Sequence, residues 1–211
     1  MAFINTVPPS EAEDDVLAMY EHFQGKYGFV PNYAKLFSHR PEVMQLWADL
    51  LNGVRRNMDR RRFELVTVAA AMAVKSTYCS LAHGKALSEY FSIRDLIAIL
   101  DDAADSPLSD AEKCMVGFAR KIAHDASSVT RDEVDRLKAH GYGDAEIFDI
   151  ASVATARCFF AQLCEGLGAA GDHAYSSLDP RLRAALSVGR PIEFTEPERV
   201  GRQADLEFAH G

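Results

Sequence analysis

The chain of 211 residues lacks features that would assign it to several protein classes. It contains only four cysteines, and its N-terminus, 1–5, has no basic region followed by an apolar one. So few cysteines in a chain of this length do not form a dense disulfide framework, and we expect reduced thiols. The missing secretory pattern points the same way, and we therefore expect a cytoplasmic protein.

Positive charge and long uncharged apolar runs are also scarce. The formal net charge is −8, whereas nucleic-acid binding needs clustered basic residues, so we expect no nucleic-acid partner. Arginines at 55–56 and 60–62 form one local basic cluster, which we interpret as a solvated helix end or a salt-bridge site between subunits of an oligomer. No apolar stretch looks long enough and free enough of charge to span a bilayer, and we expect no membrane partner.

Strand patterns are missing too, because no segment alternates apolar and polar residues at strand length. Helix-start signals are frequent, each a hydroxyl residue with an acidic residue three positions later: Ser10, Ser92, Ser109 and Thr130. Pro41 and Asp144 indicate two further starts, the second for a helix that runs to about Gly166. We therefore predict an all-α protein.

Two predicted helices, 63–74 and 147–163, are apolar nearly all round. Such helices are buried on every side, so we expect them to form the central pair of a helical bundle. They leave more apolar surface than one small chain easily covers. We therefore expect a homo-oligomer.

We interpret the chain as a single domain with three parts. Residues 1–57 form an N-terminal helical extension, 58–170 the core, and 171–211 a C-terminal arm that is richer in proline and charge. The arm contains a short helix, 180–186, followed by an extended segment. That segment either lies over a partner subunit or is disordered.

The residues best suited to catalysis lie in one segment. Cys79 and His83 are four residues apart and share one helix face, so the thiol and the imidazole can meet. Glu64 lies fifteen residues upstream among alanine, valine and methionine, where a carboxylate must be paired, protonated or linked to water. It could instead be an ordinary first-turn glutamate that pairs with Arg60 or Arg61.

Residues 75–78 interrupt the apolar run and predict a helix break. With Ser76 or Thr77 as the N-cap, Cys79 lies in the first turn of a second helix, where the helix dipole favours the thiolate. Only the thiolate form of Cys79 acts as a nucleophile, and His83 can accept the proton that the thiol loses. The plainer alternatives are a small buried thiol and an ordinary core or surface histidine.

Other motif-like patterns are weaker evidence of a function. Residues 166–171 fit G-x-G-x-x-G but follow a predicted helix rather than a strand, so they indicate a helix end. Cys158 and Cys164 are six residues apart, which is neither one helix face nor a metal-ligand spacing. We expect no metal and no nucleotide cofactor.

The segment from Glu64 to His83 resembles the AhpD-like alkylhydroperoxidase (carboxymuconolactone decarboxylase) superfamily. That family carries Glu, eleven residues, Cys-x-x-Cys, three residues and His, and this chain has Ser76 and Cys79 at the two cysteine positions. Tyr78 stands where the family often has Tyr or His. Upstream and downstream stretches resemble the peroxidase-related branch, so the resemblance covers roughly residues 5–170.

The resemblance implies an AhpD-like helical bundle and a peroxidase that reduces hydrogen peroxide or organic hydroperoxides. Cys79 would attack the peroxide, Glu64 and His83 would relay protons, and Ser76 and Tyr78 would complete the site. It also implies a homo-oligomer, which could be a dimer, a trimer or a hexamer.

The serine at the first cysteine position changes the expected cycle. The family's motif disulfide cannot form here, so the cycle would be of one-cysteine type. The sulfenic acid of Cys79 must then meet an external thiol reductant, or one of three other cysteines: Cys114, Cys158 and Cys164.

Two other functions remain open. In a non-redox lyase or isomerase, Glu64 and His83 would transfer protons α to a carbonyl or on a lactone, with Cys79 a bystander. Alternatively, the chain is a non-catalytic helical oligomer whose site has decayed. Ser76 favours these alternatives, whereas the retained Glu, Cys and His favour the peroxidase.

Overall fold

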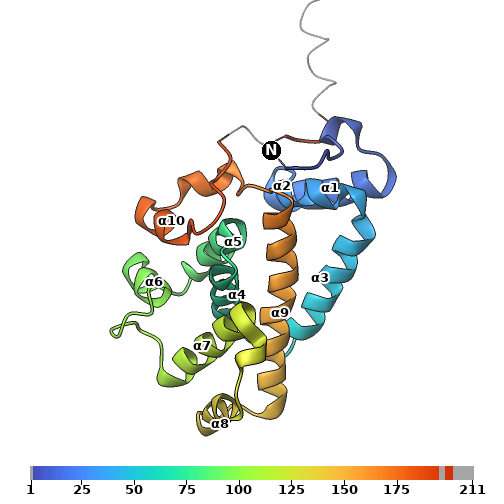
Figure 1. The fold of residues 1–211 in the computed structure, drawn as a ribbon. Helices are drawn as coiled ribbons and strands as arrows, with labels where there is room; N and C mark the ends of the chain where they lie inside the picture. The colour runs from blue at the N-terminus through green and yellow to red at the C-terminus, as the bar shows by residue number, and fades with distance from the viewer. Residues whose placement is uncertain (1, 195–197, 202–211) are drawn as a thin grey trace, which may run out of the picture.

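The computed structural model describes residues 2–194 and 198–201, and within them the chain is helical (Figure 1). The α-helices are Asp14–Tyr27 (α1), Asn32–Leu36 (α2), Pro41–Arg55 (α3), Arg60–Ala73 (α4), Thr77–Leu87 (α5), Ile93–Leu100 (α6), Asp110–Asp125 (α7), Arg131–Ala139 (α8), Asp144–Gly166 (α9) and Pro180–Leu186 (α10). Short 3-10 turns connect some of them. The described residues contain no β-strand, only an isolated bridge between Gly171 and Ile192. The predicted all-α class is confirmed.

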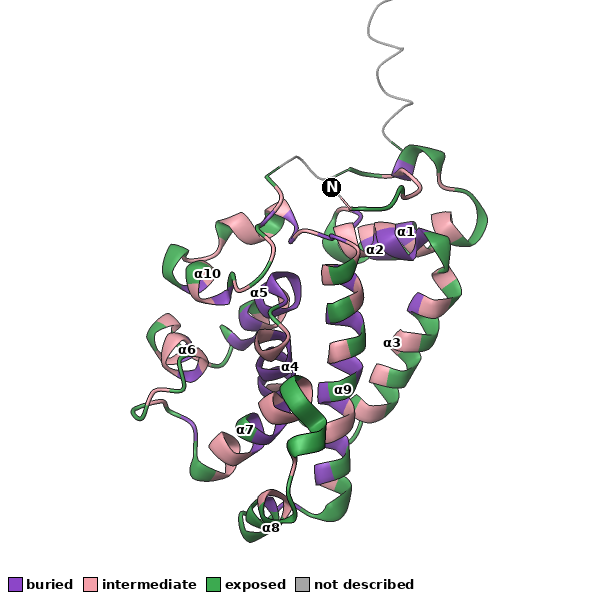
Figure 2. Cartoon of the chain, in the orientation of Figure 1, coloured by how far each residue is buried: buried purple, intermediate pink, exposed green. Residues whose placement is uncertain are grey.

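Helices α4 and α9 lie at the centre of the bundle, as predicted. Helix α4 packs against α5, α7 and α9, while α9 also packs against α3 and α7. Every residue of α4 from Phe63 to Ala71 is buried, and Figure 2 shows buried residues concentrated in α4 and α5. Helix α9 is less enclosed than expected, because one face exposes Phe148 and Phe159.

The apolar length of α9 corrects one expectation. By length and composition this helix could cross a membrane, contrary to what the sequence indicated. However, 56% of its most apolar window is buried inside the bundle. Packing against its neighbours therefore accounts for its hydropathy.

Local signals located most helix starts correctly. The Ser92 and Ser109 hydroxyls accept bonds from the third amide of α6 and α7, and Thr130 precedes α8 in a capping box. The start predicted at Ser10 is wrong, because a 3-10 turn occupies Pro9–Glu11 and the next residue is extended. Helix α1 begins only at Asp14.

The arginines at 60–62 form ion pairs within the chain, whereas the sequence suggested a solvated helix end or salt bridges between subunits. The pairs are Arg60 with Glu89, Arg61 with Glu112, and Arg62 with Asp59 and Glu146.

The described part of the C-terminal arm packs on its own chain. In α10, Leu186 is buried, and a Cβ added to Gly84 of α5 would lie 2.4 Å from its side chain. Farther along, the Gly189 N–H donates to Thr77 Oγ1 at 2.7 Å, and Ile192 is buried. This part of the arm therefore holds the start of α5. The remainder, 195–197 and 202–211, lies outside the described residues.

Candidate active site

The junction between α4 and α5 is a tight, well-bonded turn. The Ser76 N–H donates to the Ala71 carbonyl at 2.9 Å, and the Lys75 N–H donates to the Met72 carbonyl at 3.0 Å. These two bonds form a Schellman motif, which usually places glycine where Lys75 adopts a φ of 56°. A left-handed conformation costs a lysine roughly 1 kcal/mol, so the surrounding contacts must hold it. Gly189 lies against the Lys75 carbonyl, where any Cβ would collide.

Ser76 starts α5 and fixes the position of the cysteine. Its Oγ accepts a hydrogen bond from the Cys79 N–H at 3.4 Å. The predicted helix break and N-cap are therefore confirmed, and Cys79 lies in the first turn of α5. At the position where the family has its first cysteine, this chain has a buried capping hydroxyl.

Glu64 and His83 form a buried hydrogen-bonded pair. Glu64 Oε2 lies 2.6 Å from His83 Nδ1, so this carboxylate bonds His83 rather than Arg60 or Arg61. Burial lowers the pKa of His83, the Arg157 cation lowers it further, and the Glu64 bond opposes both effects. The imidazole is therefore neutral at pH 7, with Nδ1–H donating to Glu64 and Nε2 left as an acceptor.

Cys79 has a different partner from the one expected. Its side chain is buried, and Arg157 Nη1 lies 3.7 Å from Sγ. No hydrogen bond joins Cys79 to His83 among the described residues, although both line one cleft. The shared helix face thus brings thiol and imidazole to the same cavity without direct bonding.

Arg157 is a site residue that sequence reasoning missed. It is 3% exposed, and its guanidinium lies over the rings of Trp47 and Phe160, at 5.2 and 5.4 Å from their centroids. The available signal was its isolation, since it is the only basic residue in the 23 residues of α9. A lone arginine in an apolar helix requires a buried partner.

Tyr78 anchors the site to two distant segments. Its buried hydroxyl donates to Asp172, which also accepts a bond from the Asn32 N–H at 2.8 Å. Burial raises the pKa of Asp172 to about 6, against the effect of these two donors. Because the Tyr78 hydroxyl is already bonded, this residue fixes the wall of the cleft. Sequence reasoning also missed Asp172.

The cleft is large and rich in aromatic side chains. It has a volume of about 1430 Å³ and contains Glu64, Cys79, His83 and Arg157 in its lining. Rings from several helices line the rest: Phe23, Tyr27, Tyr33, Trp47, Phe63, Phe160 and Tyr175. A ligand larger than hydrogen peroxide therefore fits beside the sulfur.

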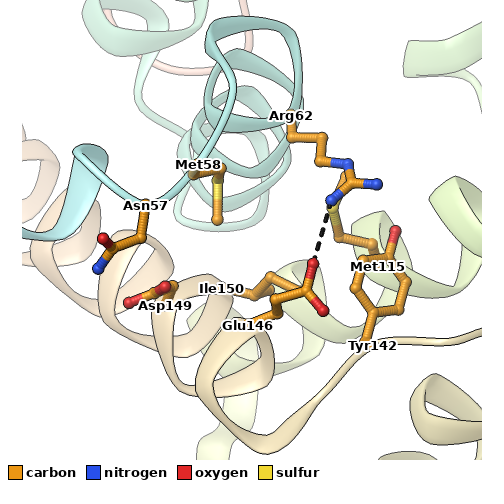
Figure 3. A pocket seen from close by; sticks show the side chains of 8 residues that line it. All are labelled: Asn57, Met58, Arg62, Met115, Tyr142, Glu146, Asp149 and Ile150. Atoms are coloured by element: carbon orange, nitrogen blue, oxygen red, sulfur yellow. Dashed lines mark hydrogen bonds and ion pairs between the residues drawn. The ribbon is translucent and has the colours of Figure 1, made fainter.

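A second cavity, shown in Figure 3, contains none of these four polar residues. It has a volume of about 10 Å³, enough for one water molecule. The Arg62–Glu146 pair borders it, with Tyr142 and Asp149 nearby. The described part of the chain contains no group of three or more His, Cys, Asp or Glu that could hold a metal ion.

The other cysteines differ in their relation to Cys79. All four thiols are free. Cys164 is buried in the same apolar cluster as Cys79, whereas Cys114 packs against the other cluster. Burial raises the pKa of Cys158 and of Cys164, and charge on Cys79 raises both further. Of the three possible internal reductants, those on α9 therefore lie nearer the site.

Comparison with known proteins gives a family match and similar solved structures. Residues 41–121, which include Glu64, Ser76, Cys79 and His83, match the model of the carboxymuconolactone decarboxylase family. A peroxidase-related protein with an AhpD core from Ralstonia eutropha JMP134 has the same fold, with a TM-score of 0.71 over 90% of this chain and 98% of that one at 19% identity. Residues 41–121 thus match a family model, and the chain has the AhpD-like fold.

Two further solved structures have the same fold. A peroxidase-related protein from Silicibacter sp. TM1040 is similar over 83% of this chain and 94% of its own, with 20% identity and a TM-score of 0.70. A variant of the debrominase Bmp8, bound to 2,3,4-tribromopyrrole, is similar over 88% and 98%, with 13% identity and a TM-score of 0.65. No curated protein matches the sequence. At these identities the likeness establishes the fold alone.

Proposed function

We propose that the protein is a thiol peroxidase that reduces hydrogen peroxide or organic hydroperoxides through Cys79, with Glu64 and His83 as proton relay. One observation carries the proposal: the three side chains at the family's Glu, Cys and His positions line one cleft, and His83 is bonded to Glu64. The AhpD-like fold, found also in peroxidase-related proteins, is consistent with it.

The relay suits the first half of such a cycle. The neutral imidazole takes up the Cys79 proton at Nε2, through water because the two side chains are not directly bonded, and Glu64 stabilises the imidazolium until it releases that proton to solvent and leaves the thiolate. The Cys79 sulfur attacks one peroxide oxygen, the O–O bond breaks, and His83 relays a proton from water to the leaving alkoxide or hydroxide. The products are the sulfenic acid of Cys79 and an alcohol or water.

The second half requires a thiol from elsewhere. Ser76 cannot form a disulfide, and its hydroxyl caps α5. In the proposed cycle one external thiol condenses with the sulfenic acid, releasing water and leaving a mixed disulfide with Cys79. A second external thiol then displaces the first and restores the Cys79 thiol.

A proton-transfer lyase or isomerase is the second candidate. It is favoured by the fact that His83 and Glu64 bond each other, whereas neither bonds Cys79. In such an enzyme His83 would move a proton on a carbonyl substrate or a lactone. Activity on that substrate would survive Cys79→Ser.

We also propose that the chain forms a homo-oligomer. Large apolar side chains are exposed on the two packed helices α3 and α9: Leu46, Leu50, Phe148 and Phe159. A second copy covering these residues would remove them from water. Light scattering of the purified protein tests this, and a monomer at micromolar concentration would contradict it.

The peroxidase proposal is tested by peroxide consumption with excess dithiothreitol. We expect activity in the wild type and none in Cys79→Ser. Cys114→Ser is the matched control, because that thiol lies on α7 outside the cleft. Equal rates in the wild type and Cys79→Ser would remove the redox function.

A further inference from the structure

Arg157 is a buried cation without a carboxylate partner. Among the described residues no Asp or Glu forms an ion pair with it, and its Nε has no hydrogen-bond partner. Its one hydrogen-bonding contact there is that of Nη1 with Cys79 Sγ at 3.7 Å. Because a buried charge is strongly unfavourable unless it is compensated, an anion is expected beside this guanidinium.

Two buried carboxylates, Glu64 and Asp172, also line the cleft, but among the described residues neither forms an ion pair with Arg157, and Asp172 is bonded by Tyr78 and the Asn32 N–H. The sulfur is the group that Arg157 contacts. Glu64, on α4, is bonded to His83 of α5. Since the pKa of His83 is lowered, the imidazole is not a cation in the resting site at pH 7. Helix α9 contributes Arg157 and two thiols, Cys158 and Cys164. Arg157 is therefore the positive group beside the sulfur.

We propose that Arg157 is a further catalytic residue, whose guanidinium is the counter-ion of the Cys79 thiolate and remains beside it while charge moves to the leaving oxygen. With the sulfur already ionised, it donates an electron pair to the near oxygen of the hydroperoxide, and the O–O bond breaks. That oxygen keeps its hydrogen in the sulfenic acid, and the departing alkoxide takes a proton from water through the His83 relay.

The surroundings of Arg157 suit a guanidinium rather than an ammonium group. Trp47 and Phe160 present their faces to it, and cation–π contacts favour a buried planar cation. Arginine also stays charged when it is buried, whereas lysine readily loses its proton. The charge beside Cys79 is therefore permanent, and the thiolate does not depend on imidazolium formation.

The test is the alkylation rate of Cys79 with iodoacetamide near pH 7, which requires no peroxide. Because a neighbouring cation favours the thiolate and only the thiolate is alkylated, we expect Arg157→Met to react roughly tenfold more slowly, or slower still. Arg62→Met is the matched control, because that arginine pairs with Glu146 outside the cleft. An Arg157→Met rate equal to or above the wild-type rate would overturn the proposal.

A second measurement leaves Arg157 unchanged, so it does not depend on how the variant folds. The ultraviolet difference spectrum between wild type and Cys79→Ser near pH 7 should contain the thiolate band, and its absence would also overturn the proposal.

Only the role in peroxide attack rests on the proposed function. If alkylation depends on Arg157 but no peroxide is consumed, the peroxidase is refuted and the counter-ion assignment stands. If peroxide is consumed but the alkylation rate of Cys79 is the same in Arg157→Met and wild type, only the counter-ion assignment is refuted.

Discussion

Replacing Asp172 with asparagine should change how stability depends on pH. Asp172 is buried, with Tyr78 and the Asn32 N–H as donors, and its pKa is raised from 3.8 to about 6. The folded protein therefore holds this proton more tightly than the unfolded chain does. The stability that the proton provides is fully present below about pH 4 and is lost as the pH rises through about 6.

A pKa of Asp172 raised from 3.8 to about 6 corresponds to about 3 kcal/mol of stability, of which about 2 kcal/mol is lost between pH 4 and pH 7. Asp172→Asn cannot ionise and keeps an oxygen for the Asn32 amide. The free energy of unfolding of this variant, relative to wild type, should therefore rise by about 2 kcal/mol over that range. Urea unfolding at several pH values measures it.

Two further variants check the cause. Tyr78→Phe removes a donor that lowers the pKa of Asp172, so it should steepen the loss of stability with pH. Asp144→Asn is a control that should stay level over this range, because Lys138 lowers the pKa of that exposed carboxylate and its contribution is lost only below about pH 4. A stability difference between Asp172→Asn and wild type that stays constant across the range would refute the argument.

Three other substitutions test separate parts of the account. Glu64→Gln should slow peroxide consumption about 10- to 100-fold through the loss of the His83 relay, and an unchanged rate would remove Glu64 from the mechanism. Gly84→Ala should lower stability by about 1–3 kcal/mol, because its methyl group would overlap Leu186; a wild-type melting temperature would show that α10 yields easily. Ser76→Cys should form a disulfide with Cys79 after peroxide treatment, detected as two lost thiols, whereas two remaining thiols would argue against peroxide attack at this site.

Features governed by neighbouring residues could be predicted from the sequence. Ser76 caps α5 because its hydroxyl and the amide it bonds are three residues apart, and Pro41 opens α3 because its fixed φ suits a first helical turn. The central position of α4 followed from its continuous apolar run. The helix start predicted at Ser10 was wrong because Pro9 starts a 3-10 turn, which competes with the capping box.

Features created by tertiary packing could not be predicted. Arg157 lies 78 positions from Cys79 in sequence, and Asp172 lies 94 from Tyr78. Each contact exists only because α9 and the segment after it fold back onto α5. No local pattern encodes such an approach, so the spacing of Cys79 and His83 suggested a direct bond where the structure has Arg157 instead.

The most direct test of the account is intact-mass analysis of the protein after one equivalent of hydrogen peroxide in the presence of a sulfenic acid trap. The account predicts a single trapped adduct that peptide mapping locates on Cys79 and that Cys79→Ser lacks. An unmodified Cys79, with the peroxide left unconsumed, would contradict the claim that this sulfur is the reactive centre.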